Sequence, residues 1–273
     1  MTPTSMWLED LAWAYLTLSF MCFVAIVVDE VRRPQKMKVM NLVWPITALY
    51  LGPVALEGYF NSGRKSTQAR HARMMEEVRR ELEQERWNRG SLEVPAEPAA
   101  SRRPSREQVA VGVLHCGAGC TLGDTAGEWW VFQMGLTFAG ATLQTRLVLD
   151  FLLAWAFGIA FQYFSIVPMR GLPVGKGILQ AIKVDTLSIV AFQVGMSAWM
   201  ALTYYVLFPS PHLEPNDAVF WFMMQVAMIV GYFTSYPANV YLLTAGWKEK
   251  MPQYKAEMKQ KMREQMVEQQ KAA

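Results

Sequence analysis

The 273-residue chain has little of what most catalytic and nucleic-acid-binding proteins need. It contains three cysteines and three histidines, and three cysteines are too few for a disulfide framework. The net charge is only +3, and the Lys and Arg residues form no single basic stripe, which argues against a nucleic-acid partner. The sequence has no phosphate-binding loop, no dinucleotide fingerprint and no soluble-type catalytic triad. These absences leave enzyme activity undecided but favour a non-enzymatic role.

Charge is also scarce inside several long apolar blocks, and this distribution decides the class of protein. A helix needs about 20 apolar residues to cross the roughly 30 Å hydrocarbon core of a bilayer. Blocks that meet or approach this length are 11–28, 40–60, 147–169, 187–208 and 219–243, and a smaller, more polar sixth candidate is 109–141. The sequence therefore predicts an all-α, polytopic transmembrane helical bundle of about six spans, in contact with lipid. The first block lacks a basic n-region and a cleavage site, so we interpret it as a retained span rather than a signal peptide.

The chain divides into four parts by composition. We expect an N-terminal pair of transmembrane helices, a soluble charged helix with a flexible linker, a four-span transmembrane bundle and a charged amphipathic tail. The boundaries are 1–62, 63–108, 109–247 and 248–273. Pro45 and the Gly52–Pro53 pair interrupt the second predicted span, which favours a kinked and well-packed helix there.

The insert 63–108 and the tail each carry a thin apolar stripe on a charged helix. The insert helix is expected to begin at Ser66 or Thr67 and to end at Gly90. Methionines spaced by four follow Tyr254 in the tail. Either segment can recruit a protein partner, whereas a solvated, charge-stabilised helix is the plainer explanation for the insert and a membrane-surface or helix-pairing role for the tail.

Basic residues predict the orientation, with one conflict. The loop 209–218 has no Lys or Arg and is expected outside, whereas the tail and 170–176 are basic and are expected inside. Counting spans backwards also places the insert inside, but it then places the basic turn 29–38 outside, against the rule. Either one N-terminal span is re-entrant, or 109–141 does not cross once. The prediction is a multi-pass protein of a cell inner membrane with a cytoplasmic C-terminus.

The segment 112–128 concentrates residues that carry chemistry. If it is helical, Cys116, Cys120, Asp124 and Glu128 share one face at a spacing of four, and His115 lies at the edge of that face. Thiolate and imidazole ligands suit Cu(I) or Zn(II), and two cysteines at i and i+4 can reach one ion. The candidate metal ligands are therefore His115, Cys116, Cys120, Asp124 and Glu128. A thiol-exchange role uses the same cysteines.

Packing alone also explains much of this segment. Gly119, Gly123 and Gly127 form a second stripe of small residues, a pattern that lets another helix backbone approach closely. The cysteines are then simply small packing residues, and the two acids mark a helix end near the headgroups.

Polar residues in the other spans suggest a path through the bundle. Ionisable groups inside a bilayer are costly, so each is expected to have a partner or to line a water-filled route. The candidates are Asp150, Lys183, Asp185 and Asn239, with Lys183 paired to Asp150, Asp185 or Asp124. Alternatively, Lys183 and Asp185 lie near the interface and reach the headgroup region.

Several short pieces resemble one bacterial membrane family. They are Arg33-Pro-Gln, Met40-Asn-Leu-Val-Trp-Pro, His115-Cys-Gly-Ala-Gly-Cys-Thr-Leu-Gly-Asp, Lys183-Val-Asp-Thr-Leu and Ser235-Tyr-Pro-Ala-Asn. The family is catalogued as a domain of unknown function, DUF4396. The resemblance covers the N-terminal pair and the bundle but not the insert or the tail. It implies a multi-pass bacterial membrane protein and supplies no reaction.

Three functions follow from these observations. The first is binding or transport of copper or zinc through the His/Cys site. The second is a structural or assembly role, in which the bundle is a scaffold and 63–108 or 248–273 recruits a partner. The third is proton-coupled transport of a small molecule through the acids and Lys183.

Overall fold

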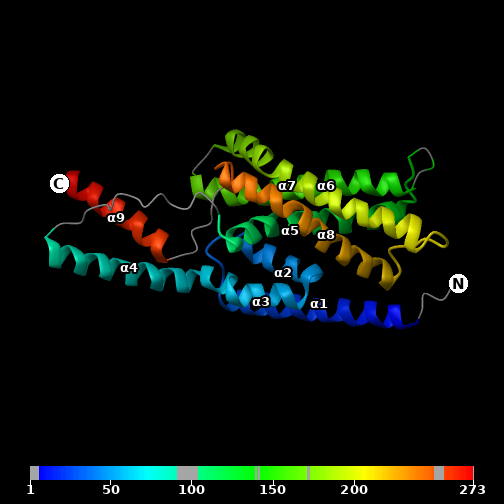
Figure 1. The fold of residues 1–273 in the computed structure, drawn as a ribbon, viewed down its shortest axis with the longest axis horizontal. Helices are drawn as coiled ribbons and strands as arrows, with labels where there is room; N and C mark the ends of the chain where they lie inside the picture. The colour runs from blue at the N-terminus through cyan, green and yellow to red at the C-terminus, as the bar shows by residue number, and fades with distance from the viewer. Residues whose placement is uncertain are drawn as a thin grey trace.

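The computed structural model describes residues 6–90, 104–138, 140, 142–170, 173–248 and 255–272, without the side chains of 166–170, 255–257, 271 and 272. Within these residues the chain is helical and contains no named strand (Figure 1). The α-helices are α1 (Met6–Arg32), α2 (Met40–Leu51), α3 (Pro53–Asn61), α4 (Gln68–Arg89), α5 (Arg106–Met134), α6 (Thr142–Arg170), α7 (Val174–Leu202), α8 (Ala218–Thr244) and α9 (Lys255–Ala272). A 3₁₀ turn, η1 (Gly63–Ser66), precedes α4, and a π-helical turn, η2 (Thr203–Leu207), ends α7.

Among the described residues, four helices are long and apolar enough to cross a membrane, namely α1, α6, α8 and α7 continued by η2. Large apolar side chains stay exposed on them, including Phe20, Leu152 and Phe233. Such surfaces are expected to contact lipid rather than water. The prediction of an all-α membrane bundle is confirmed, although α5 is as long as its neighbours and too polar to count among the four.

The second predicted span, 40–60, is not a single crossing. Gly52 takes a positive φ of 51° and joins α2 to α3, and Pro53 begins α3. Twelve residues of α2 cover only about 18 Å, too short for a bilayer core. The two helices form a hairpin that enters the bundle and returns to the end where it began (Figure 1). The loops at its two ends also meet, because Lys36 N donates to Ser66 O at 3.0 Å.

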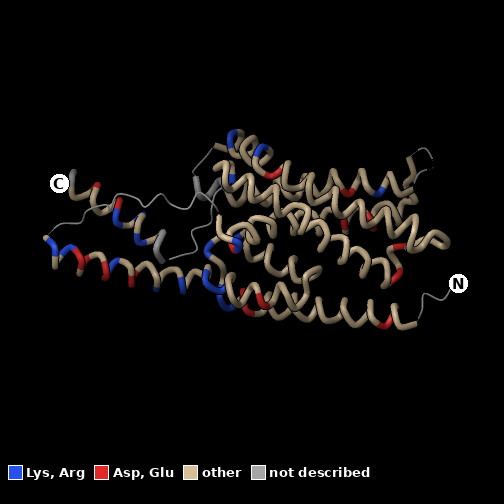
Figure 2. Tube along the Cα trace, viewed as in Figure 1, with Lys and Arg blue, Asp and Glu red and all other residues tan. Residues whose placement is uncertain are grey.

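The re-entrant hairpin removes the conflict in the predicted orientation. Six helix ends lie together at one end of the bundle, next to α4 and α9 (Figure 1). They are the end of α1, the start of α2, the end of α3, the start of α5, the start of α7 and the end of α8. Figure 2 shows the Lys and Arg residues gathered at this end, whereas the opposite end carries few of them. The basic turn 29–38 therefore lies on the same side as the insert and the tail.

The insert helix and the tail helix pack against each other. The helix predicted to end at Gly90 is confirmed, and Gly90 adopts the left-handed conformation typical of a helix end. Val78 and Leu82 of α4 pack on Met262 of α9 in a small apolar cluster. Ion pairs Lys259–Glu81 at 2.9 Å and Arg263–Glu85 at 2.6 Å show that the two helices are parallel. We call α4 and α9 the arm. The contact between α4 and α9 accounts for both apolar stripes without another protein. Binding of a protein partner stays a prediction. Tyr254 lies outside the described residues.

Candidate functional site

Helix α5 runs through the middle of the bundle and is held against α6 by its glycines. A capping box between Ser105 and Gln108 begins the helix. Ideal Cβ atoms built on Gly119 and Gly123 would lie 2.7 Å from Gly158 Cα and 2.2 Å from the Ala154 backbone nitrogen. A Cβ on Gly127 would collide with Asp150. The two backbones therefore touch along this stripe, and only glycine fits at such a close crossing.

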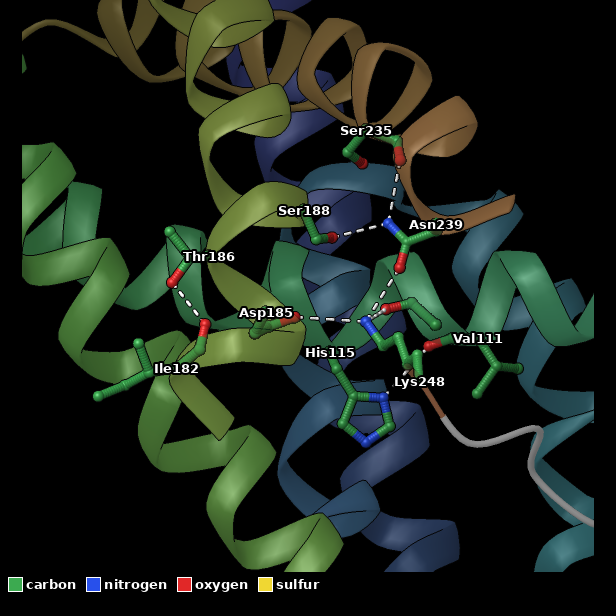
Figure 3. A network of polar contacts seen from close by, with 10 residues as sticks. Val111, His115, Ile182, Asp185, Thr186, Ser188, Ser235, Asn239 and Lys248 are labelled. Atoms are coloured by element: carbon green, nitrogen blue, oxygen red, sulfur yellow. Dashed lines mark hydrogen bonds and ion pairs between the residues drawn. The ribbon is translucent and has the colours of Figure 1, made fainter. Parts of the chain in front are cut away.

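Lys248 occupies a buried polar network at the basic end of the bundle (Figure 3). Its ammonium group lies 3.3 Å from Asp185 Oδ1 and donates to Asn239 Oδ1 at 2.9 Å and to the Gly112 carbonyl at 2.8 Å. Asn239 in turn donates to Ser188 Oγ at 2.7 Å. One lysine therefore links α5, α7 and α8, and its charge is balanced by a carboxylate that is fully buried.

His115 lies beside this network rather than beside the cysteines. Its Nδ1 lies 3.2 Å from the Val111 carbonyl, and its ring is drawn next to Lys248 in Figure 3. His115 Nε2 is buried and has no hydrogen-bond partner among the described residues. The imidazole therefore keeps one ring nitrogen without a partner beside a buried ion pair (Figure 3).

The sequence did not point to Lys248. It predicted that Lys183 is the lysine that pairs with Asp150, Asp185 or Asp124. Lys183 is exposed, and its ammonium group lies 4.7 Å from the centre of the Trp247 ring. Asp185 therefore pairs with the last residue described before α9, which composition places at the start of a solvated tail. The only sequence signal is that Lys248 directly follows an apolar span and an interfacial tryptophan.

The other half of α5 carries a second buried polar cluster. Asp124 Oδ1 accepts a hydrogen bond from Gln193 Nε2 at 2.8 Å. Glu128 Oε2 lies 3.4 Å from Arg146 Nε, and Asp150 interacts electrostatically with both Glu128 and Asp124. All three acids and Arg146 are buried. Three carboxyl groups so close to one guanidinium cannot all ionise cheaply, so the cluster is suited to share or hold protons.

Arg146 connects this cluster to the end of the bundle that has few basic residues. It also forms an ion pair with Glu214 in the α7–α8 loop, and Glu214 is partly exposed. A cavity of about 20 Å³ adjoins Arg146, Glu128 and Thr203. This volume is enough for one water molecule. Thr203 begins the π-helical turn, and its buried hydroxyl has no hydrogen-bond partner among the described residues.

The five predicted metal ligands face three different surroundings. His115 lies beside the Lys248 network, and Asp124 and Glu128 belong to the acid cluster. Cys116 and Cys120 are fully buried in a cluster with Tyr50, Phe192 and Met196. No three His, Cys, Asp or Glu side chains in the described part of the chain lie close enough together to hold a metal ion. The copper or zinc site therefore stays a prediction.

A larger cavity lies on another face of α5, at the tip of the re-entrant hairpin. Its volume is about 490 Å³, and its walls come from α1, α2, α5 and α8. Gln225 of α8 lines it and donates from Nε2 to the Leu49 carbonyl at the end of α2, at 2.5 Å. The cavity borders the cluster of Cys116 and Cys120, since Tyr50, Met224 and Met228 belong both to its lining and to that cluster.

The comparison with known families covers these helices. Residues 105–248 match the family described as a domain of unknown function (DUF4396). The chain belongs to this family. The match begins at the capping residue of α5 and ends at Lys248, so it contains both polar clusters, and it leaves out the N-terminal helices and the arm. No curated protein and no solved structure matches the chain.

Proposed function

We propose that this membrane protein couples the movement of a small molecule to the movement of protons. The observation that carries the proposal is the presence of buried ionisable clusters in both halves of one central helix. His115 and Glu128 are about 20 Å apart along α5, at 1.5 Å per residue. Buried charge at such depth is costly and is characteristic of proton and ion pathways in membranes.

Each cluster has the composition of a proton-dependent gate. Protonation of Asp185 removes the charge that holds Lys248, and this weakens the link between α5, α7 and α8. Protonation of Glu128 likewise releases Arg146, which then holds only Glu214. The Lys248–Asp185 pair closes one end of the bundle, and the Arg146–Glu128 pair closes the opposite end. Opening one end while the other stays closed provides alternating access.

The charge distribution supports an orientation for this transport. Lys and Arg are concentrated at the end that carries the arm, and such residues mark the cytoplasmic side of membrane proteins. The proposed protein lies in a bacterial inner membrane, with the C-terminus and the Lys248 network on the cytoplasmic side and the Arg146 cluster on the outer side.

Proton flux in reconstituted vesicles tests the proposal. Vesicles that contain the purified protein and the trapped pH dye pyranine are given an inward-driving potassium diffusion potential, and internal acidification is followed. Wild type is expected to exceed protein-free vesicles, and Asp185→Asn and Glu128→Gln are expected to return to that background. Glu76→Gln, at an exposed acid of α4, is the matched control and should behave as wild type. Wild-type flux equal to that of empty vesicles, or full flux in both variants, contradicts the proposal.

Binding of a soft metal is the second candidate, favoured by the surroundings of the cysteine pair. Cys116 and Cys120 share their buried cluster with Met196, Met224 and Met228. Thiolates and thioethers are the ligands that suit Cu(I). Protein purified without chelators is then expected to contain stoichiometric copper or zinc. The metal should be lost in Cys116→Ser/Cys120→Ser and kept in Cys22→Ser, and retention in the double variant argues against this candidate.

A further inference from the structure

The cavity at the hairpin tip has the size and walls of a small-molecule site. Its volume of about 490 Å³ falls within the range of roughly 300–1,000 Å³ that such sites usually have. Aromatic rings on three helices, those of Trp13, Phe20, Trp129 and Trp221, form much of the wall. The cavity adjoins Gly52, where the α2–α3 backbone turns, because Ser19 both lines it and lies against Gly52.

The lining residues define the charge of the occupant. Among the described residues, no Asp, Glu, Lys, Arg or His lines the cavity, so none of them balances an ionised ligand there. Hydroxyl and amide groups from three helices are nevertheless present, on Thr17, Ser19, Thr121, Thr125 and Gln225. Gln225 Nε2 is occupied by the Leu49 carbonyl, but Gln225 Oε1 is buried and has no hydrogen-bond partner among the described residues, so it is available to a polar group of an occupant. The walls therefore suit an uncharged molecule that is largely apolar and has a few hydrogen-bonding groups.

The position of the cavity relates it to the polar clusters. Thr121 and Thr125 follow Cys120 and Asp124 directly in α5, so the cavity and the acid cluster occupy adjacent faces of one helix. Tyr50, at the end of α2, lines the cavity and also belongs to the buried cluster around Cys116 and Cys120. A displacement of the hairpin tip therefore changes the packing of the cavity and of the buried face of α5 together.

We propose that this cavity binds an uncharged, aromatic, amphipathic small molecule, which is the transported substrate. The identification as a transport substrate rests on the proposed function, whereas the binding itself does not. Trp13, Trp129 and Trp221 line the site, so a ligand that accepts energy from tryptophan reports its own binding.

The probe for the test is N-phenyl-1-naphthylamine, a neutral aromatic amine with one N–H donor. It is titrated into the full-length protein in lipid nanodiscs, and the emission sensitised by tryptophan is recorded. Thr125→Phe and Thr17→Phe fill the cavity from α5 and from α1. Ala126→Phe and Ala14→Phe are the matched controls, because both alanines are exposed on the same helices and do not line the cavity.

Wild type and both control variants are expected to show saturable sensitised emission, and the two cavity-filling variants should bind the probe about tenfold more weakly or worse. A signal that rises linearly in wild type, as in empty nanodiscs, means that the gap holds only acyl chains and overturns the proposal. Equal saturation in Thr125→Phe and Thr17→Phe also overturns it. If Thr125→Phe is not monodisperse, Thr17→Phe decides, since its side chain is on an exposed surface of α1.

The two proposals fail in different ways. Asp185→Asn is expected to bind the probe as wild type does, because Asp185 does not line the cavity. Saturable binding without proton flux in wild type refutes the proposed coupling and keeps the site. Proton flux without saturable binding refutes the site and keeps the coupling.

Discussion

The Lys248 ammonium group lies 3.3 Å from Asp185 Oδ1, and both side chains are buried among α5, α7 and α8. Removing one member of such a pair leaves an uncompensated charge in a low-dielectric interior. We expect Lys248→Met to lower the free energy of unfolding by about 3–5 kcal/mol, and Lys248→Met/Asp185→Asn to recover most of this loss. Chemical unfolding in mixed micelles measures both.

Lys183→Met is the control for this pair. Lys183 is exposed and stacks on Trp247, so its loss should change the unfolding free energy by less than about 1 kcal/mol. If Lys183→Met is as destabilising as Lys248→Met, or if the double variant is no better than the single one, then the ion pair does not hold these helices together.

Gly123 approaches the α6 backbone more closely than Gly119 or Gly127 does. We expect Gly123→Leu to force the two backbones apart, because a Cβ at this position would lie 2.2 Å from the Ala154 nitrogen. The expected cost is about 3 kcal/mol or more, at the upper end of what overpacking usually causes. The melting temperature of the purified protein should fall clearly. Ala126→Leu, at an exposed position of the same helix, should leave it unchanged, and equal melting of the two variants contradicts a close crossing.

Labelling of single cysteines tests the re-entrant hairpin and the orientation. Lys38→Cys and Asn61→Cys lie at the two ends of the hairpin, and Asn216→Cys lies in the α7–α8 loop. In intact cells a membrane-impermeant thiol reagent should modify only Asn216→Cys, and the other two should react after permeabilisation. The native cysteines are buried and should stay unlabelled. Labelling of Lys38→Cys and Asn61→Cys from opposite sides would mean that 40–60 crosses the bilayer.

The start of α4, near His71, should become less stable at acidic pH. Partial burial and the neighbouring Lys36 lower the pKa of His71, whose Nε2 lies 2.8 Å from Lys36 Nζ. Burial and Lys261 of α9 also lower the pKa of Lys36. The unfolded chain therefore binds a proton at His71 more readily than the folded arm does. Stability that is present at neutral pH is lost as the pH falls through the ordinary histidine pKa of about 6.5.

Hydrogen exchange over residues 60–75 measures this effect. Exchange, corrected for its intrinsic pH dependence, should be more protected at pH 7.5 than at pH 5.5 in wild type. His71→Gln removes the titrating group and should abolish the difference. A pH dependence that persists in His71→Gln assigns the effect to another group.

Apolar blocks by themselves predicted the helices of the bundle. Uninterrupted apolar sequence such as 219–243 has only one inexpensive location, the bilayer, and only one backbone structure that satisfies its hydrogen bonds there. The helix end at Gly90 could also be predicted from the sequence, because glycine alone takes the left-handed conformation without strain. The spacing of Gly119, Gly123 and Gly127 indicated a close crossing, although it did not name α6 as the partner.

Only the tertiary structure decided which polar groups meet. Along the sequence, Cys116, Cys120, Asp124 and Glu128 share one face with His115 at its edge, and this suggested one metal site. In the bundle the face is divided among neighbouring helices, because Gln193, Arg146 and Lys248 reach it from α7, α6 and the end of α8. Long-range pairs such as Lys248–Asp185 join residues whose local sequence carries no sign of each other.

The second apolar block, 40–60, also shows which features composition determines and which depend on tertiary contacts. Its composition is that of a membrane span, and composition alone predicted that it lies in the membrane. Whether it crosses or returns depends on the single backbone angle at Gly52 and on the packing of α2 against α1, α5 and α8. The sequence by itself thus determined that the protein is helical and lies in a bilayer. The positions of its charges, its cavity and its hairpin follow from contacts between helices that are distant along the chain.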